Sequence, residues 1–197
     1  FKWAEFTVKK ELISKDLYLK KIKEFEVDYR AGNMDFGAYC KFLLNPLIGM
    51  TIKEINSLVE EFIKEYQQLL IDSLTYELLN KHKNDKKIIA SGSLNFIVEG
   101  FSKFFSIETF YGTPFEIKNN KITGNLDGTP TFAEGKLLTM KKWSEENNFQ
   151  LKDAIFYTDS INDLPLLKAC NNSIIVSPDN DLKNYAQENS LEIIYRQ

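Results

Sequence analysis

Two aspartates, Asp159 and Asp163, follow a short apolar run at residues 154–157. A run of this kind, bounded by polar residues, predicts a buried strand, so both carboxylates are expected just beyond its carboxyl end. Open α/β sheets bind their ligands at that edge. Carboxylate oxygens suit Mg²⁺, which takes one or two of them and keeps several waters. The pair therefore predicts a Mg²⁺ site, and the alternative is that both acids only cap the next helix.

Two more candidate residues precede these aspartates. Ser91 follows a predicted strand at residues 87–90 and is itself followed by Gly92 and a predicted helix, so a hydroxyl and free N–H groups can bind an anion there. Lys136 lies in the first turn of another predicted helix, where a cation is unfavourable unless an anion is bound nearby. Each residue by itself has a structural alternative: Ser91 as a helix cap and Lys136 as a solvated lysine. Together with the aspartates they predict a phosphate site with Mg²⁺.

The elements that must position these residues fall into two parts. Residues 1–85 have helical spacing of apolar side chains and predict a small helical bundle, with Thr51 and Glu54 forming a capping box. Residues 86–197 alternate strand and helix, which predicts a parallel sheet with right-handed crossovers. Residues 115–124 alternate around a two-residue turn and predict a β-hairpin.

The expected elements can be given by residue range. Helices are expected at residues 1–8, 16–25, 34–44, 51–63, 69–82, 95–104, 134–147 and 182–189, with a break at Gly32-Asn33. Strands are expected at residues 87–90, 107–111, 154–157, 172–176 and 191–195, besides the hairpin.

Composition narrows the class of protein. The chain has 197 residues, 43% of them hydrophobic and 27% charged, with a net charge of −3; this is typical of a globular domain and argues against nucleic-acid binding, which needs a basic face. No apolar run reaches the length of a transmembrane helix and no signal peptide is recognisable, so we predict no membrane partner and a cytoplasmic location. Cys40 and Cys170 form no metal or CxxC pattern and are predicted to be buried thiols in a reducing compartment.

The order of these candidate residues resembles the haloacid dehalogenase superfamily of phosphohydrolases, and within it the phosphoserine-phosphatase-like subfamily. The acidic motif is Asp-Ser-Ile-Asn-Asp at residues 159–163, the strand-end serine is Ser91, and the lysine between them is Lys136. The resemblance covers nearly the whole chain. It implies an α/β fold with a Rossmann-like parallel-sheet core at residues 86–197, a small helical cap domain at residues 1–85 and a β-hairpin.

The resemblance also implies an activity, the Mg²⁺-dependent hydrolysis of a small phosphorylated metabolite, phosphoserine or a similar phosphomonoester, through an aspartyl-phosphate. It implies that Ser91, Gly92 and Lys136 bind the phosphate. It also implies that Asp159 and Asp163 hold Mg²⁺ and that, with Ser91 and Lys136, they form the catalytic set.

Two residues are expected to contact the substrate. Asn162, inside the acidic motif, is one. Lys41 is the other, because it stands where phosphoserine phosphatases place a cap arginine that holds the substrate carboxylate. A lysine is a point charge and not a planar fork, so the identity of the substrate stays open.

The family's nucleophile motif, Asp-x-Asp-x-Thr, does not occur in this sequence. Because the sequence starts at Phe1, without methionine and inside a predicted amphipathic helix, we expect further residues upstream that carry this motif. The alternatives are a protein that binds a phosphorylated ligand without turning it over, and a phosphotransferase that passes the phosphoryl group to another alcohol.

Overall fold

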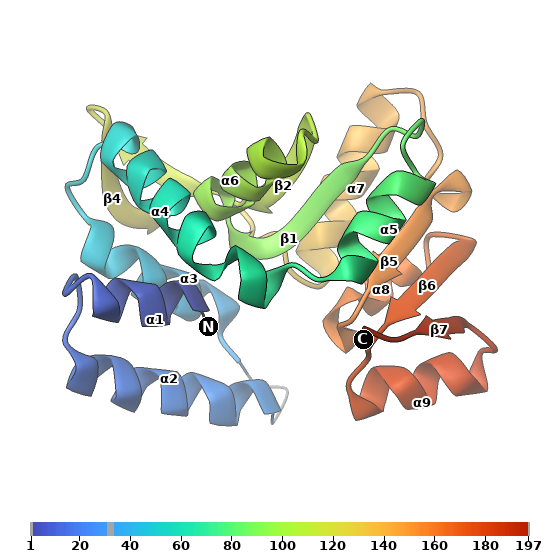
Figure 1. The fold of residues 1–197 in the computed structure, drawn as a ribbon, viewed down its shortest axis with the longest axis horizontal. Coiled ribbons are helices and arrows are strands. Elements are labelled where there is room, and N and C mark those ends of the chain that lie inside the picture. Colours follow the sequence, from blue (N-terminus) through green and yellow to red (C-terminus); the bar gives the residue numbers. More distant parts are fainter. Residues whose placement is uncertain (1, 31–33, 197) are drawn as a thin grey trace.

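The computed structural model describes residues 2–30 and 34–196, and it separates a mainly helical side from a side built on parallel strands (Figure 1). The helices are α1 (Lys2–Lys9), α2 (Lys15–Arg30), α3 (Phe36–Leu44), α4 (Ile52–Leu70), α5 (Ser73–Lys81), α6 (Asn95–Phe105), α7 (Glu134–Glu146), α8 (Leu164–Leu167) and α9 (Asn180–Glu188). The strands are β1 (Ile88–Leu94), β2 (Thr109–Thr113), β3 (Phe115–Lys118), β4 (Lys121–Leu126), β5 (Ile155–Thr158), β6 (Asn172–Val176) and β7 (Glu192–Ile194). Short 3-10 turns are η1 (Asn45–Leu47), η2 (Leu151–Asp153) and η3 (Ile161–Asp163).

The helical side has the largest apolar core of the described chain. Its centre is α4, whose buried side chains Ile55, Val59, Phe62 and Ile63 recur at helical spacing and so form one stripe. That core also takes Phe96 from α6. Because the helix after β1 packs among the helices of the first part, the division of the chain at residue 85 stays a prediction.

Local sequence signals account for several boundaries. The capping box of Thr51 and Glu54 is confirmed, with each side chain bonded to the backbone of the other. The hairpin is confirmed too: Asn119 and Asn120 connect β3 and β4 with φ of 51° and 60°, as a type I′ turn requires. The predicted break at Gly32-Asn33 lies outside the described residues.

Two predicted boundaries are wrong. The helix that opens at Thr51 continues to Leu70, and the helix expected at residues 69–82 begins only at Ser73, because Asp72 accepts a hydrogen bond from the Thr75 N–H and caps it. The strand expected to end before Ser91 continues to Leu94, since its register against β2 shifts between Ala90 and Leu94. The other predicted elements of the second part are present, with ends displaced by a few residues.

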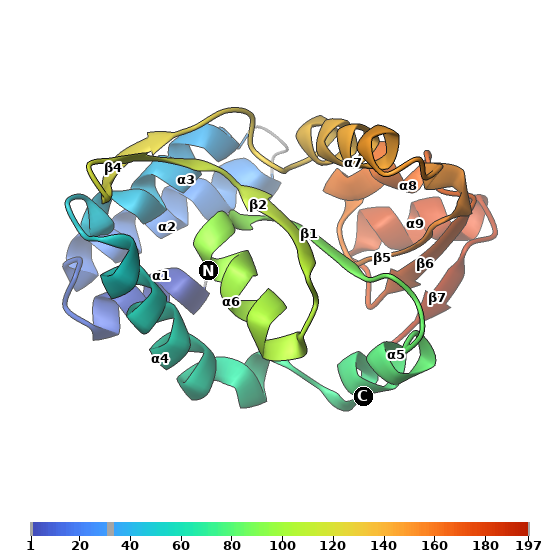
Figure 2. The ribbon, with the colours of Figure 1, turned by 90° about the horizontal axis from the view of Figure 1, so that it is seen from above.

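The parallel strands form two separate sheets. One has the order β1-β2 and the other the order β5-β6-β7, and the pairs within them are parallel. The cluster under α7 takes Ile88 and Ala90 from β1 and Phe156 from β5, and Figures 1 and 2 both draw β5 beside β1. β1 and β5 therefore both pack under α7, but they do not pair with each other.

β1 and β5 are consequently edge strands of their own sheets, and both pack under α7. Ile155 on β5 is 46% exposed, although its run predicted a buried strand. An unpaired strand edge presents backbone N–H and C=O groups that need partners.

The last features of the fold are its two cysteines and the length of its apolar helices. Both cysteines are buried, and burial raises the pKa of the Cys40 thiol to about 12 and that of the Cys170 thiol to about 11. Within the two described ranges, no helix combines the length and the apolar character needed to span a bilayer.

We expect Asp72→Ala to lower the free energy of unfolding by about 1–2 kcal/mol, because it removes a helix cap and a surface ion pair with Arg196 at 2.8 Å. The Arg196 hydrogen bond lowers the pKa of the Asp72 carboxyl from 3.8 to about 2. A lowered carboxyl pKa stabilises the fold above the unfolded value and loses that effect as pH falls through the folded value. Urea unfolding should therefore show a difference that is constant above pH ~4 and shrinks toward pH ~2.

Arg196→Gln is the matched control, because it removes the ion pair and leaves the cap in place. It should cost less than Asp72→Ala. Equal losses in the two variants would show that the cap contributes nothing.

Candidate active site

The candidate site is built around a buried ion pair between Lys136 and Asp163. Lys136 Nζ lies 2.5 Å from Asp163 Oδ1, and each residue is only 7% exposed. The other carboxylate oxygen, Oδ2, accepts a hydrogen bond of 2.7 Å from the hydroxyl of Thr158. Both oxygens of the buried carboxylate are thus satisfied, as a charge in this environment requires.

Lys136 reaches this position because the chain before it is tightly packed. It lies in the first turn of α7, as predicted. A Cβ on its neighbour Gly135 would come within 2.1 Å of the carbonyl oxygen of Pro130, a distance that no other residue type can adopt. Gly135 therefore lets the preceding loop turn directly into α7, and Figure 2 shows this segment crossing from the hairpin to the sheet side.

Thr158 also organises the turn that follows β5. Its hydroxyl accepts a hydrogen bond of 3.2 Å from the Ser160 N–H while it donates to Asp163. Asp159 lies between these groups and is exposed. In the part of the chain that the structure describes, its carboxylate makes no hydrogen bond or ion pair. The acidic motif thus places one carboxylate in the interior and leaves the other open to a ligand.

The donor chemistry of the motif fits Mg²⁺ through Asp159. An exposed carboxylate is a hard oxygen donor, and Mg²⁺ commonly takes one or two carboxylates and completes its octahedron with water and substrate oxygens. The described residues contain no group of three His, Cys, Asp or Glu side chains placed to bind a metal. Asp163 has both oxygens engaged with protein groups, so its part in metal binding stays a prediction.

Ser91 and Gly92 lie within β1, and not beside the helix N-terminus that the sequence predicted. They fall in the register shift between Ala90 and Leu94, so they have no ladder partners on β2 in the described structure. Irregularities of this kind recur beside active sites, because they release backbone groups from the sheet. The Gly92 carbonyl accepts a hydrogen bond of 2.7 Å from Thr113, which ties this segment to the end of β2.

Two contacts join the helical side to these segments. Phe36, the first residue of α3, stacks on Phe132 with ring centroids 4.0 Å apart, and both rings lie against Gly92. Asn162 of the acidic motif donates a hydrogen bond of 3.0 Å to the hydroxyl of Tyr29 on α2. Lys41 is exposed further along α3, and its contact with a substrate stays a prediction.

Sequence reasoning missed several of these residues. Thr158 carried a signal, because it directly precedes the first aspartate of the motif on a predicted strand. Phe36, Phe132 and Tyr29 carried none, since aromatic residues at helical spacing or in loops are usually core residues.

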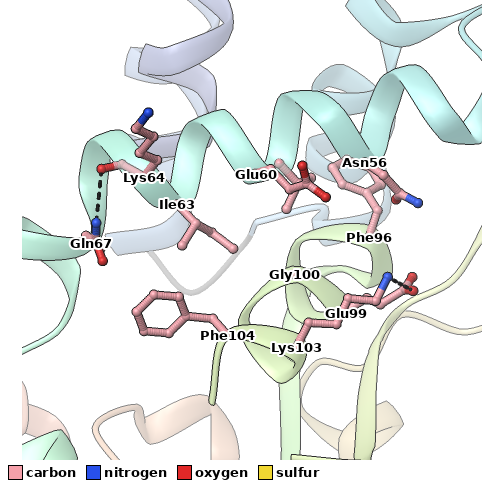
Figure 3. Close-up of a pocket in the computed structure, with 11 residues that line it drawn as sticks. Asn56, Glu60, Ile63, Lys64, Gln67, Phe96, Glu99, Gly100, Lys103 and Phe104 are labelled. Carbon is pink, nitrogen blue, oxygen red and sulfur yellow. Dashed lines mark hydrogen bonds and ion pairs between the residues drawn. The ribbon is translucent and has the colours of Figure 1, made fainter. Parts of the chain in front are cut away.

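One cavity lies away from these residues. It measures about 380 Å³ and lies between α4 and α6, where Figure 3 shows Ile63 and Phe104 on opposite sides of the space. Close approach of the two helices depends on Gly100, whose Cβ would lie 2.3 Å from Cγ1 of Val59. None of the predicted site residues lines this cavity, so we place the chemistry at the acidic motif.

The parallel α/β fold and the motifs along it are those of a known hydrolase class. The chain belongs to the haloacid dehalogenase-like hydrolases, the family that matches residues 2–168. Within that family it is close to phosphoserine phosphatase and histidinol-phosphatase members. The family assignment confirms the resemblance inferred from the sequence.

Two relatives and one solved structure show what this chain is similar to. It is 30% identical over 198 residues to the histidinol-phosphatase of Neisseria meningitidis serogroup C (strain 8013), which covers 98% of this chain and 89% of that protein. It is 24% identical over 148 residues to the phosphoserine phosphatase of Lactococcus lactis subsp. lactis (strain IL1403), covering 75% and 66% of the two chains. A crystal structure of a Bordetella pertussis Tohama I protein of unknown function has the same fold, with a TM-score of 0.88, 23% identity and coverage of 98% and 89%.

We expect Thr158→Val to lower the free energy of unfolding by about 1.5–3 kcal/mol, because a hydrogen bond to a buried charged carboxylate is lost. Thr7→Val is a matched control: Thr7 is equally buried, but its hydroxyl donates to the neutral Ala4 carbonyl and should contribute about 0.5–1.5 kcal/mol. Denaturant unfolding of both variants gives the comparison. A larger loss in the control would contradict the assigned role of Thr158.

Proposed function

We propose that this protein is a Mg²⁺-dependent phosphatase that hydrolyses a small phosphomonoester through an aspartyl-phosphate. The observation that carries the proposal is the buried Lys136–Asp163 pair beside the exposed Asp159, at the carboxyl end of β5. Paired in this way, the Lys136 side chain has its counter-charge beside it in the interior. A substrate phosphate would bind to a cation that is already held in place.

Each predicted residue then has a distinct task. Lys136 offsets the charge that phosphate and an attacking carboxylate bring together. Asp163 positions Lys136 through the 2.5 Å contact. Ser91 and the N–H of Gly92, which lie outside the β1-β2 ladder, bind phosphate oxygens. These groups act by preorganised charge and hydrogen bonds, which supply most of the catalysis in phosphoryl transfer.

Asp159 is the residue that would hold Mg²⁺. The ion supplies charge neutralisation of the phosphate oxygens, so that an anionic nucleophile can approach phosphorus. Thr158 and Ser160 fix the turn that presents the Asp159 carboxylate. Contacts of this kind behind a metal ligand orient its side chain toward the metal.

We propose that the nucleophile is an aspartate on a strand that would lie between β1 and β5. Trp3 of α1 packs against Phe96 of α6 with ring centroids 5.3 Å apart, and α6 directly follows β1. The beginning of α1 therefore lies near the carboxyl end of β1. A parallel strand that runs into α1 would end at the same edge as Asp159, and an aspartate there would face the phosphate site.

The named substrates of the two relatives, histidinol phosphate and phosphoserine, are the compounds to test first. Both are small phosphomonoesters of amino alcohols. The contacts of α2 and α3 with Asn162 and Gly92 support a role for the helical side in covering the bound substrate and excluding water.

The second candidate function is phosphate binding without turnover. It is favoured by one observation, that no aspartate of the described residues lies on β1 or β5 between their ends to act as a nucleophile. This protein would bind inorganic phosphate but release no alcohol from a phosphomonoester. Transfer to an added alcohol would instead identify a phosphotransferase.

We expect Asp159→Asn to lower kcat for phosphomonoester hydrolysis by at least about 10²-fold, the scale observed when one charge-stabilising group is removed, and to weaken the activation by Mg²⁺. Phosphate release from each substrate at a series of Mg²⁺ concentrations measures both effects.

Asp153→Asn is the matched control, because Asp153 is an exposed aspartate at the opposite end of β5. It should keep the activity of the unchanged protein. Full activity of Asp159→Asn would refute the metal assignment, while absence of turnover in the unchanged protein would favour the binding function.

A further inference from the structure

We propose that Phe36 and Phe132, here called the aromatic wall, bind the leaving group of the substrate, and that the preferred phosphomonoester carries a flat ring and no carboxylate on its alcohol. The inference rests on the proposed function, because that function places the phosphate at Ser91 and Gly92. It adds which alcohol the site selects.

The aromatic wall lies directly against the phosphate-binding segment. A Cβ on Gly92 would come 2.9 Å from Cζ of Phe36 and 3.4 Å from Cδ2 of Phe132. Any larger residue at this position would displace a ring, so Gly92 and the two phenylalanines fit one another. A phosphate bound at Ser91 and Gly92 would therefore have its ester oxygen beside aromatic carbon.

The two rings are stacked face to face. Their planes differ by 4° and their centroids are 4.0 Å apart, and both side chains are only half-buried. One ring comes from the start of α3 and the other from the loop before α7. A ring of the substrate can lie on the exposed part of such a pair with little loss of conformational freedom, and aromatic pairs gain energy beyond the area that they bury.

The helical side holds Phe36 in place. Asp35 caps α3 by accepting a hydrogen bond of 2.8 Å from the Ala38 N–H, which fixes the first turn of the helix. Phe36 also contacts Tyr39, which in turn contacts Phe25 on α2. The aromatic wall is therefore continuous with the packing of α2 and α3, and is preorganised before a ligand binds.

A polar group of α2 lies beside the acidic motif. The Tyr29 hydroxyl accepts a hydrogen bond from Asn162, so its own proton can be donated to a ligand. Tyr29 is 40% exposed, which leaves it within reach of a substrate. An amide and a phenol suit a ring nitrogen or an uncharged polar group.

The residues of the proposed leaving-group site offer a carboxylate no positive charge. None of the four residues Tyr29, Phe36, Phe132 and Asn162 is a cation. Lys41 follows Phe36 by five residues, which turns it by about 140° around α3, away from the face that contacts Gly92. Aromatic faces attract cations and repel anions. A neutral or protonated ring is therefore the better match.

The test compares two probes, histidinol phosphate, which has a ring and no carboxylate, and phosphoserine, which has a carboxylate and no ring. The unchanged protein should show the higher kcat/KM with histidinol phosphate. Phe36→Leu should lower that value about tenfold, the scale of discrimination by one apolar contact in a pocket, and should change the value for phosphoserine by less than about twofold. Inhibition by inorganic phosphate should be unchanged.

Phe42→Leu is the matched control, because it makes the same substitution on the same helix in the main apolar core. Phe132→Leu tests the wall from the other element if Phe36→Leu is unstable. Equal losses with both probes, a preference of the unchanged protein for phosphoserine, or selectivity that is lost in Lys41→Ala and kept in Phe36→Leu would overturn the inference and leave the phosphatase assignment standing. Absence of hydrolysis with every phosphomonoester would instead refute the proposed function, and the inference with it.

Discussion

The buried contact between Lys136 and Asp163 is the interaction on which the rest of the site depends. Two charges that are each 7% exposed are stable in the interior only as a pair, and removal of one partner from such a pair costs about 3–5 kcal/mol. The pair joins the first turn of α7 to the turn after β5. It therefore fixes two elements from different parts of the chain and leaves Asp159 directed outward.

The second constraint is the division of the parallel strands into two sheets. β1 and β5 share the cover of α7 through Ile88, Ala90 and Phe156, yet each is the edge of its own sheet. The helix therefore holds the two sheets together without a ladder of hydrogen bonds between β1 and β5.

Much of the fold follows from local sequence, because local interactions decide it. The capping box at Thr51, the hairpin turn at Asn119-Asn120 and the helix that begins near Lys136 each depend on residues within one or two turns of chain. The start of α5 was expected too early in the chain, although its Asp72 cap is also local. The true end of β1 could not be predicted, because it depends on register against β2 and not on the residues of β1.

The sequence by itself determined the chemistry, that is, a serine, a lysine and two aspartates in the order typical of haloacid dehalogenase-like hydrolases. Only the tertiary structure decided how those groups are used. It paired Asp163 with Lys136 and exposed Asp159, and it brought Tyr29 to Asn162 across 133 residues and Phe36 to Phe132 over Gly92. Spacing along the chain sets which residue types recur, whereas burial and pairing depend on contacts between distant segments, which no local pattern records.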